Sequence, residues 1–460
     1  MLNTRQKVSY GICRLGTSTL LNIVTFFTFW AYKDIFAIPA ELSGIGNAFG
    51  KIAIAFSGFI FGYLSDVIDR SNSKWGRRQI FMWIGSPLLA ISFIMLFTPH
   101  LFIPVEKGMM RFGWLMIWNA LFHIFYGMLL TPYQSWMPEI TGEDERINVS
   151  ALQNVSNITG SLVGTGFTFM IASKLNEPFE LNIINGNQIY SPGGIEGSFG
   201  NVLFIAVIAF AVIEAALFLP ALLTIKEKAV VHEKRNIWEE VKVALKNRNY
   251  VIYMISFSII WIGVIVMSAM MLDFITELLG FTTTAQSLTF ALAMFATVIV
   301  GFGFWSFIGN RIGKKKGLII SFIWLVVWMP LTPLIGRIDF IPLNVQGYLY
   351  GIGAVFGSAS AFLYSYAIIS DIADKDERDT SRNRSGLYTG FKHIPTNIGQ
   401  ASGYIIAGFL STIPGNKGLM WLGPIAVAFF IIAFPIFIRG DFDPFLKNNK
   451  KPTAEIANSK

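Results

Sequence analysis

The chain of 460 residues contains a single cysteine, Cys13, and few charged residues. One cysteine excludes a disulfide framework and a cysteine-based zinc site. Charged residues make up 14% of the chain, whereas soluble globular proteins contain roughly 25%. The motifs HExxH and GxSxG are absent, and no cysteine–histidine cluster has metal-ligand spacing. We therefore expect neither an enzyme nor a resident metal or other cofactor.

Long apolar segments dominate what remains, since 53% of the residues are hydrophobic. Residues 203–223 form one such segment, broken only by Glu214, and residues 419–438 form another. About 20 apolar residues cross a bilayer core as a helix that closes its own backbone hydrogen bonds. The first apolar run, 20–32, lacks a small-residue cleavage site, so we interpret it as a span rather than a signal peptide. These features predict an all-α, multi-pass membrane protein.

We expect about twelve membrane-spanning helices in two sets of six. The first set is 10–32, 42–66, 79–97, 113–137, 149–173 and 201–225; the second is 251–274, 286–308, 318–335, 347–371, 386–410 and 419–438. Lys and Arg gather in loops on one side, at 70–78, 226–235 and 311–316, and in the tail at 439–451. The positive-inside rule places these loops and both termini in the cytoplasm. They also account for the net charge of +8 without a nucleic-acid partner.

A polar segment divides the two sets. Ile237, Val241, Ala244 and Leu245 recur at helical spacing within it, which predicts an amphipathic helix on the inner membrane surface. The expected organisation is a six-helix half at 1–225, a linker at 226–249, a second six-helix half at 250–438 and a cytoplasmic tail at 439–460. Two six-helix halves with a substrate site between them are typical of major facilitator transporters.

Several motifs are distributed over the two halves. They are Ser73-Lys-Trp-Gly-Arg-Arg78, Pro132-Tyr-Gln-Ser-Trp-Met-Pro138-Glu-Ile-Thr, Ser370-Asp-Ile-Ala-Asp-Lys-Asp-Glu-Arg-Asp-Thr380, Gly386-Leu-Tyr and Asn397-Ile-Gly-Gln-Ala-Ser-Gly403. Together they resemble the glycoside–pentoside–hexuronide:cation symporters, the family of melibiose and xyloside permeases in the major facilitator superfamily. The resemblance implies a secondary transporter that moves a sugar, glycoside or hexuronide-like solute by alternating access.

The sequence departs from this family at its sodium site. The resemblance places a basic residue and then two acids in the second span, and Lys51 falls on the basic position in the register that matches Gly62 and Asp66 to the family motif. The positions that the family fills with acids, or with the lysine of the eleventh span, hold other residues: Ile54 and Gly58 in one register or Ser57 and Phe61 in the other, then Leu130, Ser18 and Asn397. Sodium prefers several oxygen ligands, including anionic ones. We therefore expect no sodium coupling through the family's usual site.

Polar residues within spans are candidates for solute binding, because charges inside a bilayer are costly. Lys51, Lys392 and His393 are the charged or titratable ones. The uncharged ones are Asn154, Asn157, Thr396, Asn397 and Gln400, and the rings of Trp261 and Tyr364 suit stacking on a sugar. The alternatives are snorkelling or pairing for the lysines and interhelical hydrogen bonds for the amides. The lysines, without nearby acids, indicate an anionic solute such as a hexuronide.

Two titratable residues are candidates for proton coupling, His123 in the fourth span and Glu214 in the sixth. A hydrogen-bonded structural role is the alternative for each. Resemblance to the facilitator motif implies an inner gate of charged residues, comprising Asp66, Arg70, Arg77, Arg78 and Asp371. Uniport is an alternative to proton coupling. The rival function on the same fold is an exporter or transporter of a non-sugar amphiphile, drug or lipid.

Overall fold

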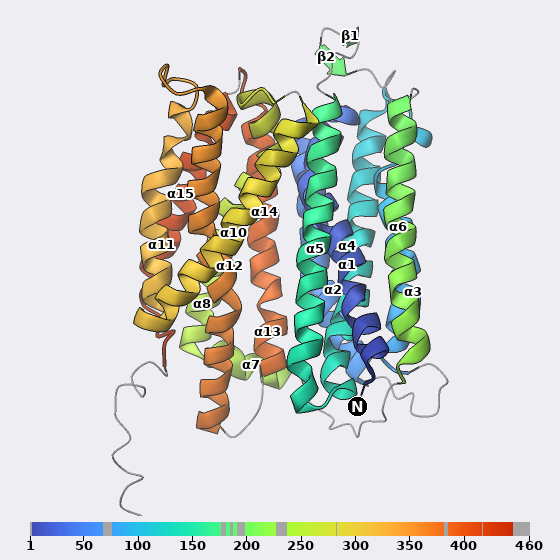
Figure 1. Ribbon diagram of the computed structural model, residues 1–460, viewed down its shortest axis with the longest axis vertical. Helices are drawn as coiled ribbons and strands as arrows, with labels where there is room; N and C mark the ends of the chain where they lie inside the picture. Colours follow the sequence, from blue (N-terminus) through green and yellow to red (C-terminus); the bar gives the residue numbers. More distant parts are fainter. Residues whose placement is uncertain are drawn as a thin grey trace, which may run out of the picture. The chain divides into compact units, whose positions relative to one another are not determined.

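The computed structural model describes residues 2–67, 76–175, 181–184, 187–190, 198–226, 237–281, 283–380, 385–415 and 417–444. Its architecture is helical throughout, apart from one short pair of strands (Figure 1). The strands β1 (Leu181–Ile184) and β2 (Asn187–Tyr190) pair in antiparallel register, with Leu181 opposite Tyr190. The sequence pattern did not predict this pair.

The helices follow the predicted spans closely. Those before residue 226 are α1 (Thr4–Trp30), the π-helical turn η1 (Ala31–Ile35), α2 (Ala40–Val67), α3 (Gln79–Leu96), the short η2 (Pro99–Leu101), α4 (Gly108–Ile140), α5 (Glu143–Leu175) and α6 (Ser198–Thr224). Those after it are α7 (Ile237–Lys246), α8 (Arg248–Ala269), α9 (Met271–Asp273), the π-helical turn η4 (Phe274–Leu278), α10 (Thr284–Ile312), α11 (Lys314–Trp328), η5 (Met329–Leu334), α12 (Leu343–Thr380), α13 (Ser385–Phe391), α14 (His393–Ser411) and α15 (Lys417–Phe437).

Eleven helices of the described chain are long and apolar enough to cross a membrane. The prediction of an all-α, multi-pass membrane fold is thereby confirmed, whereas the orientation of the termini stays a prediction. The predicted span 386–410 is not among the eleven. The structure divides it into α13 and α14 at Lys392, and α14, although 19 residues long, has several polar residues in its first turns. Pro395 explains the break, since proline has no N–H and its ring clashes with the carbonyl four residues earlier.

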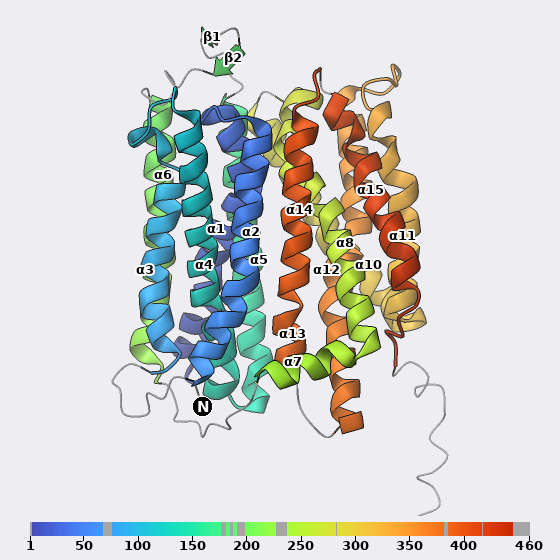
Figure 2. The same ribbon diagram turned by 180° about the vertical axis from the view of Figure 1, so that it is seen from behind.

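The chain forms two compact units. The first comprises Met1–Arg235, Val264–Leu292 and Asn397–Leu422, and the second comprises Asn236–Gly263, Ala293–Thr396 and Gly423–Lys460. Within the first, α1 packs against α5 and α6, α2 against α4, and α3 against α4 and α6. Both ribbon views show α1 to α6 running alongside one another (Figures 1 and 2). The division into six-helix halves with a linker and a tail stays a prediction.

The second unit contains the helix that the linker pattern predicts. Here α7 contacts α13, while α12 packs against α11 and α13. Tyr250 fixes this corner, because its hydroxyl donates a 2.8 Å hydrogen bond to the carbonyl of Tyr388. That α7 lies on the membrane surface stays a prediction.

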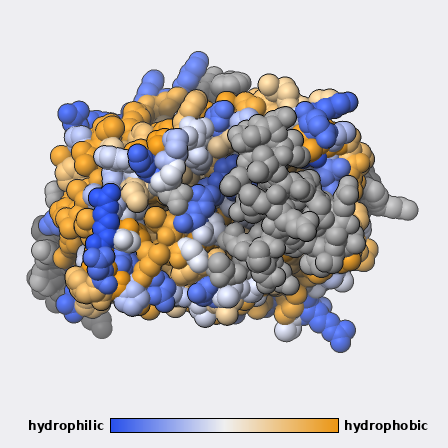
Figure 3. Space-filling model, turned by 90° about the horizontal axis from the view of Figure 1, so that it is seen from above, coloured by the Kyte–Doolittle hydropathy of each residue, from blue (hydrophilic) through white to orange (hydrophobic). Residues whose placement is uncertain are grey.

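Large apolar side chains cover the outer faces of the helices. Leu223 is 72% exposed, Val327 is 65% exposed and Ile205 is 64% exposed. Orange, apolar residues are also visible along the edge of the face drawn in Figure 3. Contiguous apolar surface of this kind is unfavourable in water but matches the hydrocarbon of a bilayer.

Candidate functional site

Lys51 is a buried charged residue of the first unit. It lies within α2 and is 6% exposed, and it forms no ion pair with a described carboxylate. Its Nζ atom lies 6.0 Å from the ring centroid of Tyr404 on α14, near the outer limit for a cation–π contact. Tyr404 is fixed in turn, since its hydroxyl donates a 2.9 Å hydrogen bond to the carbonyl of Thr25. The Lys51 ammonium is therefore buried with this weak contact and no ion pair to a described carboxylate.

Two polar residues of α4 lie beside this position. His123 Nδ1 lies 2.9 Å from the carbonyl of Asn119, one turn earlier, and Asn119 Nδ2 donates to the carbonyl of Gly46 at 3.2 Å. Among the described residues, His123 Nε2 and Asn119 Oδ1 are buried without a hydrogen-bond partner. Both side chains contact α2 at Gly50, where a Cβ atom would lie 2.6 Å from Asn119 Nδ2.

This group therefore joins one charge to two unsatisfied polar atoms. Buried polar atoms in folded proteins nearly always have partners. A hydroxyl-rich anion would supply both the negative charge for Lys51 and the missing hydrogen bonds. Asn119 and Tyr404 were not among the predicted site residues; the spacing of four residues between Asn119 and His123 could have indicated the first.

A second polar group connects α1 and α5. Arg14 Nη2 donates a 2.7 Å hydrogen bond to Asn157 Oδ1, and Ser18 Oγ donates to the same oxygen at 2.6 Å. Arg14 Nη1 is buried without a partner among the described residues. Asn154, three residues before Asn157, is exposed. Asn157 thus has the interhelical bonding role given above as its alternative, while Arg14 retains an unused donor.

Other predicted solute-binding residues lie at the start of α14. Lys392 is 3% exposed, whereas the adjacent His393 is exposed, so the two point to different faces as expected. Thr396 Oγ1 donates to the carbonyl of Lys392 at 2.9 Å. Asn397 is 7% exposed and Gln400 is half-buried.

The two aromatic candidates lie within the second unit. Trp261 is half-buried and packs edge-on against Phe362, with ring centroids 5.1 Å apart. Tyr364 is 2% exposed, and its hydroxyl donates to the carbonyl of Trp305. In this conformation the Tyr364 ring is occupied by helix packing. That Lys51 and Lys392 both bind an anionic solute stays a prediction.

Glu214 lies at the centre of α6 and is completely buried. Ser86 Oγ is 3.5 Å from its Oε2, at the limit of a hydrogen bond, and its Oε1 has no partner among the described residues. α1 approaches closely, since a Cβ atom on Gly16 would lie 2.7 Å from the Cα of Glu214. Its surroundings are therefore helix contacts.

The predicted inner gate is partly described. Arg77 and Arg78 share one partner, Glu139 on α4, and Arg78 Nη2 lies 2.8 Å from its Oε1. Asp371 on α12 forms an ion pair with Lys314 at the start of α11. Asp66 lies in the last turn of α2, and Arg70 lies outside the described residues. The arginine partner Glu139 belongs to a motif quoted above but was not among the predicted gate residues.

Within the described part of the chain, one group of three carboxylates has oxygens close enough to hold a metal ion, namely Asp34, Asp273 and Glu277. None of the three lies at the positions where the resemblance places the sodium ligands.

Comparisons with known proteins agree with this architecture. The profile of a family described as MFS/sugar transport protein matches residues 9–435. An uncharacterized symporter from Synechocystis sp. is 25% identical, over 95% of this chain and 92% of its own length. The isoprimeverose transporter of Lactiplantibacillus pentosus is 23% identical, over 90% of this chain and 81% of its own length.

A shorter match joins residues of this chain to a putative sulfoquinovose importer of Salmonella typhimurium, at 26% identity over 36% of this chain and 34% of that protein. Among solved structures, a D-xylose-proton symporter has a TM-score of 0.64 at 14% identity, covering 96% of this chain and 98% of that one. At this identity the likeness concerns the fold.

Proposed function

Because the chain belongs to the MFS/sugar transport protein family, we propose that it is a secondary transporter of an anionic, sugar-like solute. The single observation that supports a negatively charged solute is the burial of Lys51 in α2 without a described carboxylate partner. Its family and relatives are transporters. Transport then proceeds by alternating access, in which the solute selects between two conformations of similar free energy.

The anionic group is the finer part of the proposal. Burying an ammonium without a counterion is unfavourable by several kcal/mol, at order of magnitude. A carboxylate or sulfonate on the solute would remove this cost during binding. The name of one relative points the same way, because sulfoquinovose is a sugar that carries a sulfonate group. Another relative is named as a transporter of isoprimeverose, which is a neutral sugar.

The proposed binding residues divide into two roles. Lys51 reads the negative charge, while His123 Nε2 and Asn119 Oδ1 hydrogen-bond the hydroxyl groups of the solute. Lys392, His393, Thr396, Asn397, Gln400, Asn154 and Trp261 are proposed to complete the site as the conformation changes. Asn157 supports it by holding Arg14.

Coupling to an ion is a separate proposal. The carboxylates of the family's sodium site are replaced in this chain, which disfavours sodium at that position. His123 and Glu214 are the proposed proton carriers within the helices. Uptake that persists unchanged after the proton gradient is collapsed would remove this proposal and leave uniport.

A thermal-shift screen of the purified protein tests the solute class, because a ligand that binds the folded state raises its unfolding temperature. The solutes are matched pairs of a uronic acid or sulfonated sugar and the neutral parent sugar. We expect the anionic member of at least one pair to stabilise the wild type and to lose its effect on Lys51→Met. Stabilisation by amphiphiles alone would instead support the exporter of a non-sugar solute.

A further inference from the structure

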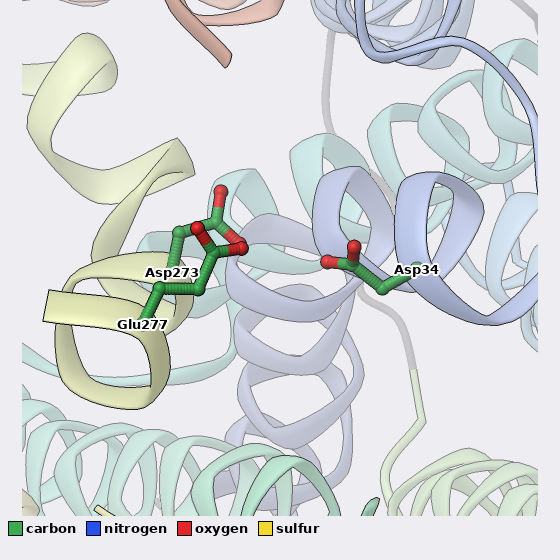
Figure 4. Close-up of side chains that lie close together, drawn as sticks. All are labelled: Asp34, Asp273 and Glu277. Carbon is green, nitrogen blue, oxygen red and sulfur yellow. The ribbon is translucent and has the colours of Figure 1, made fainter. Parts of the chain in front are cut away.

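Four charged side chains meet beyond the C-terminal end of α1. Lys33 and Asp34 lie in η1, Asp273 ends α9, and Glu277 lies in η4. All four belong to the first compact unit. In Figure 4 the Asp34 carboxylate points toward the side chains of Asp273 and Glu277. Each of the two π-helical turns thus contributes acid to one cluster, and π turns are frequent at functional sites.

Lys33 lies among the three carboxylates. Its Nζ atom is 2.9 Å from Asp273 Oδ1, 3.2 Å from Asp34 Oδ2 and 3.4 Å from Glu277 Oε1. One oxygen from each carboxylate lies within 4.8 Å of the others. Asp273 is 1% exposed, and its Oδ2 is buried without a hydrogen-bond partner among the described residues.

The charges of this cluster do not balance. Within the described residues, the one ammonium of Lys33 faces the carboxylates of both Asp34 and Asp273. One negative charge is therefore in excess when these groups are ionised, before Glu277 is counted. Like charges at this separation disfavour the ionised form, and burial does so as well. Burial accordingly raises the pKa of Asp273 above its ordinary value, against the opposing effect of Lys33 and with a contribution from Glu277.

A proton is the ligand that corrects this imbalance. A metal ion would have to displace the Lys33 ammonium, which already lies in hydrogen-bond contact with Asp273. A proton needs only one carboxylate oxygen, and Asp273 Oδ2 has no other partner among the described residues.

A cavity of about 200 Å³ adjoins the cluster. Lys33, Asp273 and Glu277 line one side, and the end of α14 with the turn after it, Leu410 to Gly415, lines the other. Ser411 Oγ, in this lining, is buried without a hydrogen-bond partner among the described residues. The cavity gives protons and water a path to the acids.

We propose that Lys33, Asp34, Asp273 and Glu277 form a proton-binding gate, which takes up a proton when η1 and η4 close on each other and releases it when they separate. The inference rests on the proposed function, since only a transporter needs such a gate. In the separated form the carboxylates are hydrated and bind protons more weakly. By linkage, acid therefore favours the closed form. With the predicted orientation, this gate faces the outside.

The test measures access to the cavity and requires no solute. A variant with Cys13→Ser and Ser411→Cys is labelled in membranes with an impermeant maleimide, in sodium-free buffers of different pH. The rate is divided by that of Asn344→Cys, an exposed position in the first turn of α12 that does not line the cavity, which corrects for the ionisation of the thiol. We expect the normalised rate to fall about tenfold between about pH 8 and about pH 5, as for one proton that the closed form binds about two pKa units more tightly than a hydrated carboxylate with a pKa of about 4.

Three carboxylate variants complete the design. Asp273→Asn imitates the protonated acid, so its labelling should be slow and independent of pH. Glu277→Gln changes a side chain that is 42% exposed, so it should disturb folding less. It should make the labelling rate less dependent on pH than in the parent, as Asp273→Asn does. Asp339→Asn, an exposed carboxylate between η5 and α12, is the matched control and should behave like the parent.

The parent here is the protein with Cys13→Ser and Ser411→Cys. A normalised labelling rate of this parent that does not change with pH would overturn the inference. The same holds if Asp273→Asn shows the same pH dependence as the parent. A rate that responds to added sodium but not to pH would replace the proton with a metal ion. Failure of the gate and failure of the proposed function can be told apart. A pH-dependent gate in a protein that binds no sugar removes the function alone, and a pH-independent gate in a protein that transports sugar removes the gate alone.

Discussion

At the scale of single residues, Lys51 is expected to reduce stability and to provide affinity. Replacing a buried charge with an apolar side chain of similar length often leaves a protein equally or more stable. Lys51→Met should therefore keep or raise the unfolding temperature in detergent. It should also weaken the binding of an anionic solute by about tenfold or more, which is the usual contribution of a charge-assisted hydrogen bond.

The control for this variant is Lys242→Met, which changes an exposed lysine of α7. It should leave both the unfolding temperature and the affinity unchanged. Titration of each variant with the solute found in the screen checks both quantities. If Lys51→Met binds the anion as tightly as the wild type does, Lys51 does not read the charge.

Asn157 provides a second test at this scale. Its Oδ1 accepts hydrogen bonds from both Arg14 and Ser18. Asn157→Ala leaves a partly buried guanidinium without this acceptor, which should cost about 1–3 kcal/mol of stability. The neighbouring Asn154→Ala, at an exposed position, should change stability by about 0.5 kcal/mol or less. Comparable losses of thermal stability in the two variants would contradict the role given to Asn157.

At the scale of secondary-structure elements, α2 and α14 cross in unusually close contact. A Cβ atom on Gly44 would lie 2.4 Å from the carbonyl oxygen of Tyr404, and one on Gly408 would lie 2.8 Å from that of Ala40. Gly44→Ala must push the helices apart, and overpacking of this kind costs about 1–3 kcal/mol. The unfolding temperature should fall.

Gly303→Ala is the matched control for this crossing, because a Cβ atom there meets nothing within 4 Å. Alanine is intrinsically the better helix former by about 1 kcal/mol, so this variant should be slightly stabilised. Opposite signs for the two substitutions are the expected result. A Gly44→Ala protein as stable as Gly303→Ala would show that the crossing tolerates separation.

The same scale shows what sequence patterns can and cannot predict. Hydropathy predicted eleven of the spans, since a bilayer requires long apolar segments whatever their neighbours. It did not predict the break at Lys392, where Pro395 was the available signal. The π-helical turns η1 and η4 also have no sequence signature, and they determine where Asp34 and Glu277 point.

At the scale of the whole molecule, the family followed from motifs spread over both halves, and the profile match confirms it. Individual site residues were harder to predict. A lone charge in a span, such as Lys51, is visible in any sequence, but its neighbours Asn119 and Tyr404 come from distant segments. The acid cluster was missed for the same reason, because its members are about 240 positions apart along the chain and only folding joins Lys33 to Asp273.

The most direct test of the central claim is uptake into proteoliposomes of a matched pair, a sugar acid and its neutral parent sugar, by the wild type, Lys51→Arg and Lys51→Met. We predict that the wild type and Lys51→Arg transport the acid in preference to the neutral sugar, and that Lys51→Met loses this preference. Equal preference in all three proteins, or uptake of amphiphiles but of neither sugar, would contradict the account.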